Sequence, residues 1–260
     1  MKGKREIFLV VTVVCGACVM GFILLPLVNM FTSSSWQDLK VTVQDKEVLK
    51  SIWLSVYTAG LAAIISFLGG TPFAYLLARK NFFGKKFIES VIDLPMVIPH
   101  PVVGIAILSI VGRDYWFGQI LSRIGIRIMG SVLGIVVVLT FVGIPFYINT
   151  AKDGFKGVPS RLEKVSRSLG ASMFSTFLWI TFPLSWRSML VGIIMCCARA
   201  ISEFGAVVIV AYHPMVASVM IYERFEAYGL AYSRPIAVLL TLVCLLLFLV
   251  LRVLSVSKLR

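Results

Sequence analysis

The segment Ser160-Arg-Leu-Glu-Lys-Val-Ser-Arg-Ser-Leu-Gly170 lies between two long apolar stretches of the chain, and it is itself short, basic and amphipathic. Leu162, Val165 and Leu169 follow the spacing of one face of an α-helix. The three basic residues of the segment fall largely off that face. The pattern predicts a short helix with an apolar side and a basic side.

Both ends of this helix carry signals. Ser160 and Glu163 have the spacing of a capping box, in which the serine oxygen accepts an early backbone N–H and the glutamate reaches back. Gly170 permits the left-handed backbone that ends a helix. Such a helix either lies on lipid headgroups with its basic side toward anionic lipid, or inserts as a plug into a groove of a partner protein. The pattern alone favours neither interpretation strongly.

The rest of the chain is dominated by membrane spans. It has 260 residues, of which 59% are apolar and 14% charged, and a spanning helix needs roughly 20 apolar residues. We therefore expect an all-α integral membrane protein with one domain, residues 1–260, and a cytoplasmic elbow at residues 151–187. Six spans are predicted: Ile7–Met30, Ile52–Leu77, Ile88–Val111, Val132–Ile148, Ser188–Val210 and Ile236–Leu254.

The net charge of +13 is distributed unevenly between the two sides. With six spans, sixteen basic residues fall on the side of the termini and eight on the other, and Arg199 lies within a span. By the positive-inside rule both termini are cytoplasmic, and the charge does not indicate a nucleic-acid partner. The sixteen are Lys2, Lys4, Arg5, Arg79, Lys80, Lys85, Lys86, Lys152, Lys156, Arg161, Lys164, Arg167, Arg187, Arg252, Lys258 and Arg260.

A few polar residues lie inside the predicted spans. Arg199 and Glu203 are four residues apart, on one helix face. The third span opens with Asp93 and reaches His100 through three prolines that break the helix. These four residues are candidates for a transport pathway or gate. In the alternative, structural interpretation, Arg199 and Glu203 form an ion pair that fixes helix packing, and His100 is a hydrogen-bonded packing residue.

Enzyme chemistry is not indicated. The chain has no paired carboxylates, no Ser/His/Asp set and no metal cluster, and Cys15-x-x-Cys18 lacks the second pair that a zinc site needs. It also has no G-x-x-x-x-G-K-[ST] phosphate loop. If ATP drives transport, another chain binds the ATP and Mg²⁺.

Glu163-x-x-Ser-x-x-x-Gly170, followed after nine residues by Ile180-x-Phe-Pro183, resembles the EAA motif of ATP-binding-cassette importer permeases. Two alanines of the family pattern are replaced by Val165 and Ser166, and a leucine by Phe182. The resemblance implies a type I permease fold in which residues 160–170 form the coupling helix, with Leu162, Glu163, Val165, Leu169 and Gly170 at the joint with the ATPase.

Three further segments are similar to the oxyanion branch of that family: Asp93–Gly104, Ile201–Ile209 and Pro214–Arg224. They look most like molybdate/tungstate permeases, with sulfate or thiosulfate as the alternative cargo. The resemblance implies a homodimer in the lipid membrane, two ATPase subunits and an extracellular oxyanion-binding protein. The competing class is a stand-alone secondary transporter or channel in which His100, Arg199 and Glu203 relay an ion.

Overall fold

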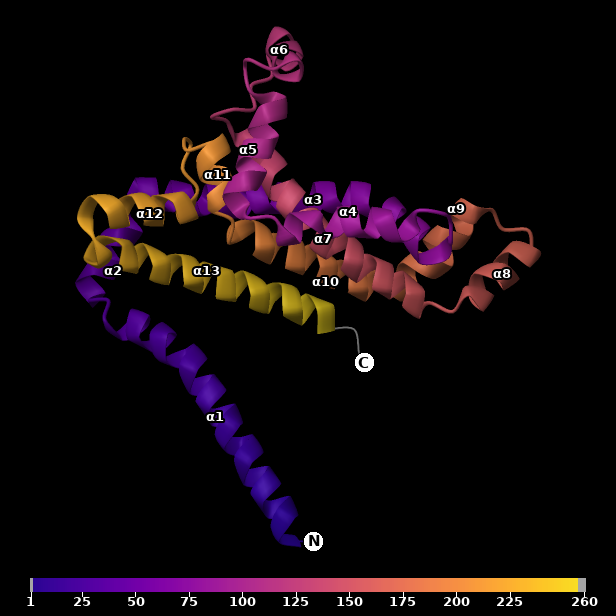
Figure 1. Ribbon diagram of the computed structural model, residues 1–260, viewed down its shortest axis with the longest axis horizontal. Coiled ribbons are helices and arrows are strands. Elements are labelled where there is room, and N and C mark those ends of the chain that lie inside the picture. Colours follow the sequence, from indigo (N-terminus) through magenta and orange to yellow (C-terminus); the bar gives the residue numbers. More distant parts are fainter. Residues whose placement is uncertain (1, 257–260) are drawn as a thin grey trace.

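The computed structural model describes the backbone of residues 2–256 and the side chains of residues 8–250 and 253. Every regular element in this part of the chain is helical, as predicted (Figure 1). The elements are α1 (Lys2–Thr32), α2 (Trp36–Gln44), α3 (Lys46–Arg79), α4 (Lys85–Val97), α5 (His100–Val111), α6 (Trp116–Arg123), α7 (Val132–Gly157), α8 (Ser160–Ser168), α9 (Met173–Thr176), the π-helix η1 (Phe177–Thr181), α10 (Phe182–Ile201), α11 (Gly205–Val210), α12 (Ala217–Tyr228) and α13 (Leu230–Val256).

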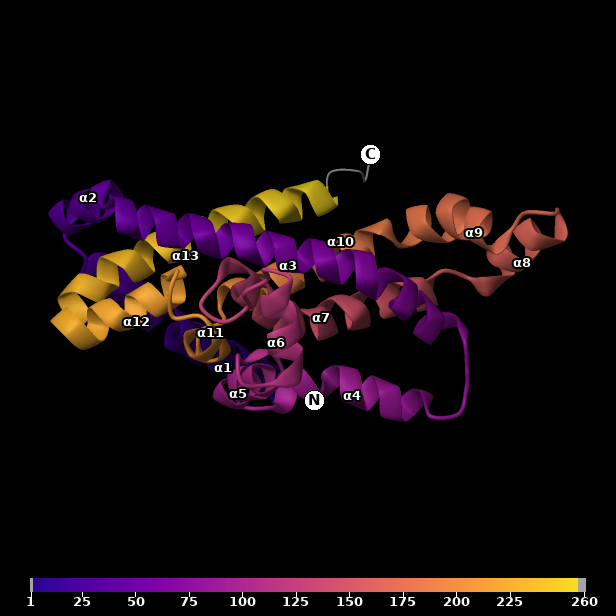
Figure 2. The same cartoon turned by 90° about the horizontal axis from the view of Figure 1, so that it is seen from above.

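Three long helices, α3, α7 and α10, pack together at the centre of the molecule (Figures 1 and 2). Small residues on α3 allow its neighbours to approach closely, and the fully buried Tyr147, Phe155 and Met189 fill the space between the helices. Close packing matters here because lipid tails are as apolar as the helix surfaces, so burial alone does not drive association. The buried small residues of α3 are Ala59, Ala62, Ala63, Gly70 and Ala74.

The predicted number of spans agrees with the structure. Five helices are long and apolar enough to cross a membrane, and α4 with α5 makes a sixth crossing if the bent pair is one span. These two helices meet at 112°, with the break at Ile98 and Pro99. The helix is therefore interrupted as expected, but at Pro99 alone, because Pro95 lies within α4 and Pro101 in the first turn of α5. α5 projects away from the bundle with α6 at its tip (Figure 1).

Several helices extend beyond the predicted spans, and the fifth span differs most. The fifth span was predicted over Ser188–Val210, but the helical run extends over Met173–Ile201 and breaks before α11. The apolar residues that follow Met173 belong to this fifth span. The span ends before Glu203, because the carboxylate of that residue caps the next helix. The predicted elbow, residues 151–187, includes the last turns of α7, which continues to Gly157, and the first part of the helical run that begins at Met173. We use "elbow" below for residues 158–172.

Apart from the segment around α6, most connecting segments lie at two opposite ends of the bundle. The elbow and α9 lie at one end, and α2 and α12 at the other (Figures 1 and 2). At the far end, Arg224 Nη2 lies 3.5 Å from Asp45 Oδ2 and 3.4 Å from Glu47 Oε2, which joins α12 to the start of α3. Met1, residues 257–260 and the side chains of Lys2, Lys4, Arg5 and Arg252 lie outside the described part, so the prediction for the termini is not tested.

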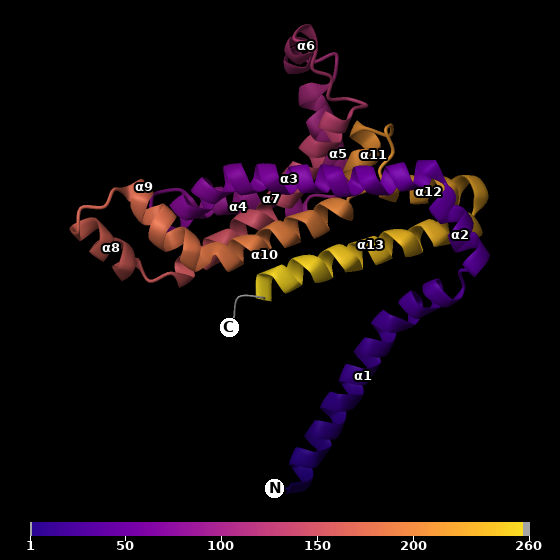
Figure 3. The same ribbon diagram turned by 180° about the vertical axis from the view of Figure 1, so that it is seen from behind.

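The first helix diverges from the bundle (Figures 1 and 3). None of the apolar stretch that makes Phe8–Thr32 a candidate span is buried, and its Val, Leu and Phe side chains point outward all round. A helix that is apolar on every side needs lipid or protein around it. The single chain therefore leaves one complete span without a protein neighbour along most of its described length.

Candidate functional site

The elbow contains the predicted amphipathic helix. α8 spans Ser160–Ser168, and Gly170 adopts φ of +92° just beyond it. That left-handed conformation is strained for any residue with a side chain, so the glycine terminates the helix as predicted. Leu162, Val165 and Leu169 are 43%, 51% and 85% exposed. The apolar face of α8 is thus uncovered in the single chain.

The predicted capping box does not form. The N-cap position is Pro159, and no side chain caps the first turn of α8. Glu163 is instead buried, and its carboxylate turns toward the membrane bundle. The prediction failed because Glu163 has stronger partners than the backbone N–H of its own helix: a guanidinium group and two hydroxyl groups on neighbouring elements.

Arg79, at the last turn of α3, is the main partner of Glu163. Arg79 Nε and Nη2 donate to Glu163 Oε1 over 2.9 and 2.7 Å. The same Nη2 donates to the carbonyl oxygen of Val158 over 3.0 Å, at the end of α7. Charge-assisted bonds of this kind are short and strong. One guanidinium group therefore joins α3, the end of α7 and α8.

Two hydroxyl groups complete the shell around Glu163. Thr181 Oγ1, at the end of the π-helix η1, donates to Oε1 over 2.7 Å, and Tyr75 Oη of α3 donates to Oε2 over 3.3 Å. The aromatic rings of Tyr75, Phe155 and Phe177 pack against one another beside these bonds. The single inserted turn of a π-helix changes which side chains face a neighbour, and such turns are frequent at functional sites.

Sequence reasoning missed Arg79, Tyr75 and Thr181 as functional residues. Arg79 was counted only as a loop cation, and the other two were not distinguished from the apolar spans around them. The available signal was Glu163 itself, the only acidic residue in a basic helix. Its partners come from segments distant in sequence, so spacing could not reveal them.

A second polar cluster lies where two helix breaks meet. His100 begins α5 after the α4–α5 break, and Glu203 lies in the break between α10 and α11. Arg199 Nη2 lies 2.6 Å from Glu203 Oε2, and His100 Nδ1 lies 3.1 Å from the same oxygen. The structure therefore brings together three of the four candidate pathway residues.

Glu203 holds this junction together. It is 1% exposed, and its Oε1 accepts the backbone N–H of Ala206 over 2.9 Å, which caps the first turn of α11. A Cβ atom on Gly205 would lie 2.9 Å from His100 Cβ, so the two breaks approach as closely as a glycine allows. The described contacts favour a packing role, although the His100 side chain stays 47% exposed.

Asp93 is not part of this cluster. Its Oδ1 accepts a hydrogen bond from Asn149 Nδ2 of α7 over 2.6 Å, one break away from His100 along the chain. That bond fastens α4 to the bundle in the described structure. Asp93 thus belongs to helix packing rather than to the junction of the two breaks.

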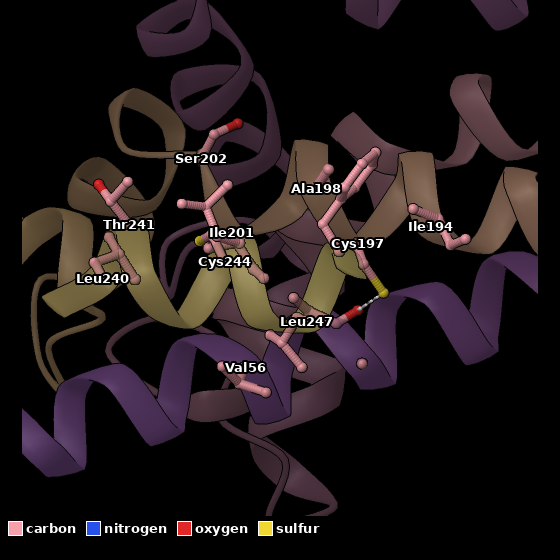
Figure 4. A pocket seen from close by; sticks show the side chains of 14 residues that line it. Val56, Ile194, Cys197, Ala198, Ile201, Ser202, Leu240, Thr241, Cys244 and Leu247 are labelled. Carbon is pink, nitrogen blue, oxygen red and sulfur yellow. Dashed lines mark hydrogen bonds between the residues drawn. The ribbon is translucent and has the colours of Figure 1, made fainter. Parts of the chain in front are cut away.

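An apolar cavity of about 560 Å³ lies between α3, α10 and α13 (Figure 4). Val56, Cys197, Ile201 and Leu240 are among its lining residues, and no charged side chain lines it. Its polar groups are few; the bond drawn in the figure runs from Cys197 Sγ to the Ala59 carbonyl oxygen over 3.8 Å. The cavity therefore offers nothing to balance an anion. Among the described residues there is also no cluster of three metal-ligating side chains.

Comparisons with known proteins agree with the fold. The family described as "Binding-protein-dependent transport system inner membrane component" matches residues 70–257. The molybdate/tungstate transport system permease protein WtpB of Pyrococcus furiosus is 44% identical over 91% of each chain. The probable sulfate transport system permease protein cysT of Zygnema circumcarinatum is 32% identical, covering 86% of this chain and 79% of that one.

Among solved structures, a bacterial ABC transporter involved in the import of the acidic polysaccharide alginate superposes with a TM-score of 0.77 at 15% identity, covering 100% of this chain and 99% of that one. The fold is therefore that of the membrane-spanning subunit of an ATP-binding-cassette importer. The chain belongs to the family of inner membrane components of binding-protein-dependent transport systems. It is a multi-pass transport subunit of the membrane, not an enzyme, and this membership disfavours a stand-alone transporter or channel.

Proposed function

We propose that this chain is the permease subunit of an ATP-driven importer for molybdate and tungstate. The observation that carries the proposal is its 44% identity, over 91% of both chains, to a permease named for those two oxyanions. The relative named for sulfate is 32% identical. Sulfate is therefore the alternative cargo.

In this proposal two copies of the chain, each acting as one domain of residues 1–260, form the membrane part of the importer. The exposed apolar surface of α1 supports a second copy, because the single chain leaves that span uncovered. An extracellular oxyanion-binding protein delivers the cargo. The larger number of basic residues on the elbow side supports a cytoplasmic elbow and cytoplasmic termini.

The elbow is the proposed docking point for two ATPase subunits, one on each permease. Leu162, Val165 and Leu169 form the exposed apolar face of α8, which suits insertion into a groove of a partner. ATP and Mg²⁺ bind to that partner, since this chain has no phosphate loop. ATP must bind the closed ATPase pair more tightly than the open pair. Only that difference in binding free energy can shift the conformational equilibrium of the permease.

Glu163 and Arg79 give the elbow a rigid connection to the bundle. A displacement of α8 is passed to α3 through the two bonds between Arg79 and Glu163, and to η1 through Thr181. The junction of Arg199, Glu203 and His100 then holds the two broken helices in register. In this proposal it is a hinge beside the pathway, and the cargo does not bind there.

The proposal is tested by reconstituting the chain in liposomes with its ATPase and binding protein. ATP hydrolysis is measured with molybdate, tungstate and sulfate in parallel. We expect stimulation by molybdate and tungstate at concentrations where sulfate has little effect. Equal or stronger stimulation by sulfate would reassign the cargo, and uptake without any ATPase subunit would contradict the importer itself.

A homodimer is tested by cross-linking in the same liposomes. The native cysteines are first replaced by alanine, and single cysteines along α1 that carry a photoreactive thiol reagent should then attach to the second copy, since α1 packs against it in this proposal. Cysteines at the exposed tip of α6 serve as the matched control. Cross-linking that is no more efficient for α1 than for α6 would argue against contact through α1.

A further inference from the structure

Two adjoining cavities of opposite chemistry lie beneath α8, where the α3 span ends. The first, of about 470 Å³, is bordered by Arg79, Lys80, Lys164 and Arg167. The second, of about 340 Å³, is almost entirely apolar and includes Phe174 and Phe177. The two share the lining residues Pro72, Tyr75 and Met173, so the basic cavity continues directly into the apolar one.

The basic cavity has a surplus of positive charge. Of the described residues that line it, Glu163 alone is acidic, and Glu163 is already paired with Arg79. Among the described residues, Lys80, Lys164 and Arg167 make no ion pair. Three positively charged side chains thus border this cavity, and no described carboxylate pairs with them. An anionic ligand would balance them.

This surface differs from the proposed ATPase docking face. Lys164 and Arg167 are three residues apart on α8 and border the cavity together with Glu163. Leu162, Val165 and Leu169 lie on the exposed apolar side instead. α8 therefore presents one side to the cavity and keeps another free.

We propose that the paired cavities bind an anionic phospholipid, with its phosphate among the three cations and an acyl chain along the apolar cavity. The position supports a lipid: both cavities lie where two candidate spans end, α3 at Arg79 and the next at Met173, and the ends of spans are the parts of a membrane protein that come nearest to lipid headgroups. Basic pockets between spans on the cytoplasmic side are known to suit such headgroups. The inference rests on the proposed cytoplasmic position of the elbow, but not on the proposed cargo or ATPase.

The test uses the full-length chain purified in a neutral detergent and titrated in a native mass spectrometer. Phosphatidylglycerol, phosphatidylcholine with the same acyl chains, and glycerol 1-phosphate are the three probes. We expect phosphatidylglycerol to bind more tightly than phosphatidylcholine, and glycerol 1-phosphate to displace neither. Equal binding of the two lipids overturns the proposal, and displacement by glycerol 1-phosphate identifies a site for soluble anions instead.

The double variant Lys80→Gln/Arg167→Gln removes two of the three unpaired cations. Each surface cation contributes about fivefold to binding of anionic lipid, so the affinity for phosphatidylglycerol should fall about 25-fold. The matched control is Lys50→Gln/Arg123→Gln, which removes two exposed cations elsewhere. A similar loss in both variants would show a general charge effect and contradict a site.

A second measurement uses the unchanged chain and so does not depend on the folding of a variant. Phosphatidylglycerol with a photoreactive acyl chain is cross-linked, and the attached peptides are sequenced. We expect attachment near Tyr75 and within residues 173–177. Attachment only at other residues shows that the lipid binds another surface and overturns the proposal. Loss of the attachment when a co-purified ATPase subunit is present shows that the protein partner occupies these cavities instead, which also overturns it.

Discussion

Glu163 is the residue on which the position of α8 depends, because its carboxylate accepts bonds from α3 and η1, and its partner Arg79 also donates to the end of α7. Replacing it by alanine leaves the Arg79 guanidinium largely buried without a counter-charge. Removal of one partner from a buried pair typically costs about 3 kcal/mol. We expect Glu163→Ala to lower the midpoint of thermal unfolding and to reduce ATP-driven uptake in proteoliposomes.

The control for Glu163 is Leu162→Ala, on the next residue of the same helix but on its exposed side. That variant should unfold like the unchanged chain and yet bind the ATPase less well. A reversed pair, Glu163→Arg with Arg79→Glu, should recover part of the lost stability. If Glu163→Ala unfolds at no lower temperature than Leu162→Ala, the bonds to Arg79 do not hold the elbow in place.

Variants of Glu203 and His100 distinguish a packing role of the helix junction from a role in transport. Glu203→Ala leaves Arg199 without its carboxylate and the first turn of α11 uncapped, so we expect a marked loss of folded protein in the membrane. His100→Asn should change uptake little, since Arg199 and Glu203 still pair without it. Glu226→Ala, at an exposed position, is the control. A large loss of uptake in His100→Asn at normal protein levels would assign the histidine to the pathway.

Among the elements, the elbow gives the sharpest test of coupling. Gly170→Val forces a β-branched residue into φ of +92°, which strains the backbone by about 1–2 kcal/mol and tilts the end of α8. We expect ATP hydrolysis to continue while uptake falls severalfold. Gly157→Val is the matched control, because that glycine has open space and no positive φ. The two rates are measured in the same proteoliposomes, and unchanged uptake in Gly170→Val would remove the coupling role from this turn.

The elements that local sequence patterns control were predictable. The helix at residues 160–168, its end at Gly170 and the break at Pro99 each depend on a few adjacent residues. The partners of Glu163 and the extent of the fifth span were not, because they depend on contacts between segments far apart in the chain. Ser160 with Glu163 matched a capping box locally, but Arg79, 84 residues away, decides where the carboxylate points. Glu203 pairs with Arg199 as the spacing predicts, but it lies just past the end of α10 and also caps the next helix, which the spacing does not show.

At the scale of the whole molecule, the two ends of the bundle differ in charge and in structure. The elbow end combines a basic cavity, an exposed apolar helix face and the Arg79–Glu163 bonds. The far end is closed by α2 and α12, whose segments are joined by Arg224 to Asp45 and Glu47. The elbow end thus leaves an apolar surface free for the proposed partner, whereas the far end is held by ion pairs within the chain.

The orientation of these ends is the remaining global prediction. Because basic residues concentrate on the elbow side, Asn81→Cys in the α3–α4 connection should be cytoplasmic and Gln119→Cys on α6 extracellular. A membrane-impermeant maleimide applied to intact cells should label Gln119→Cys alone, and lysed cells should show both. The native cysteines are first replaced by alanine, and a chain with no added cysteine gives the background. Labelling of Asn81→Cys in intact cells would show that the topology is the reverse of the predicted one. The elbow would then lie outside the cell, where an ATPase driven by cellular ATP could not reach it.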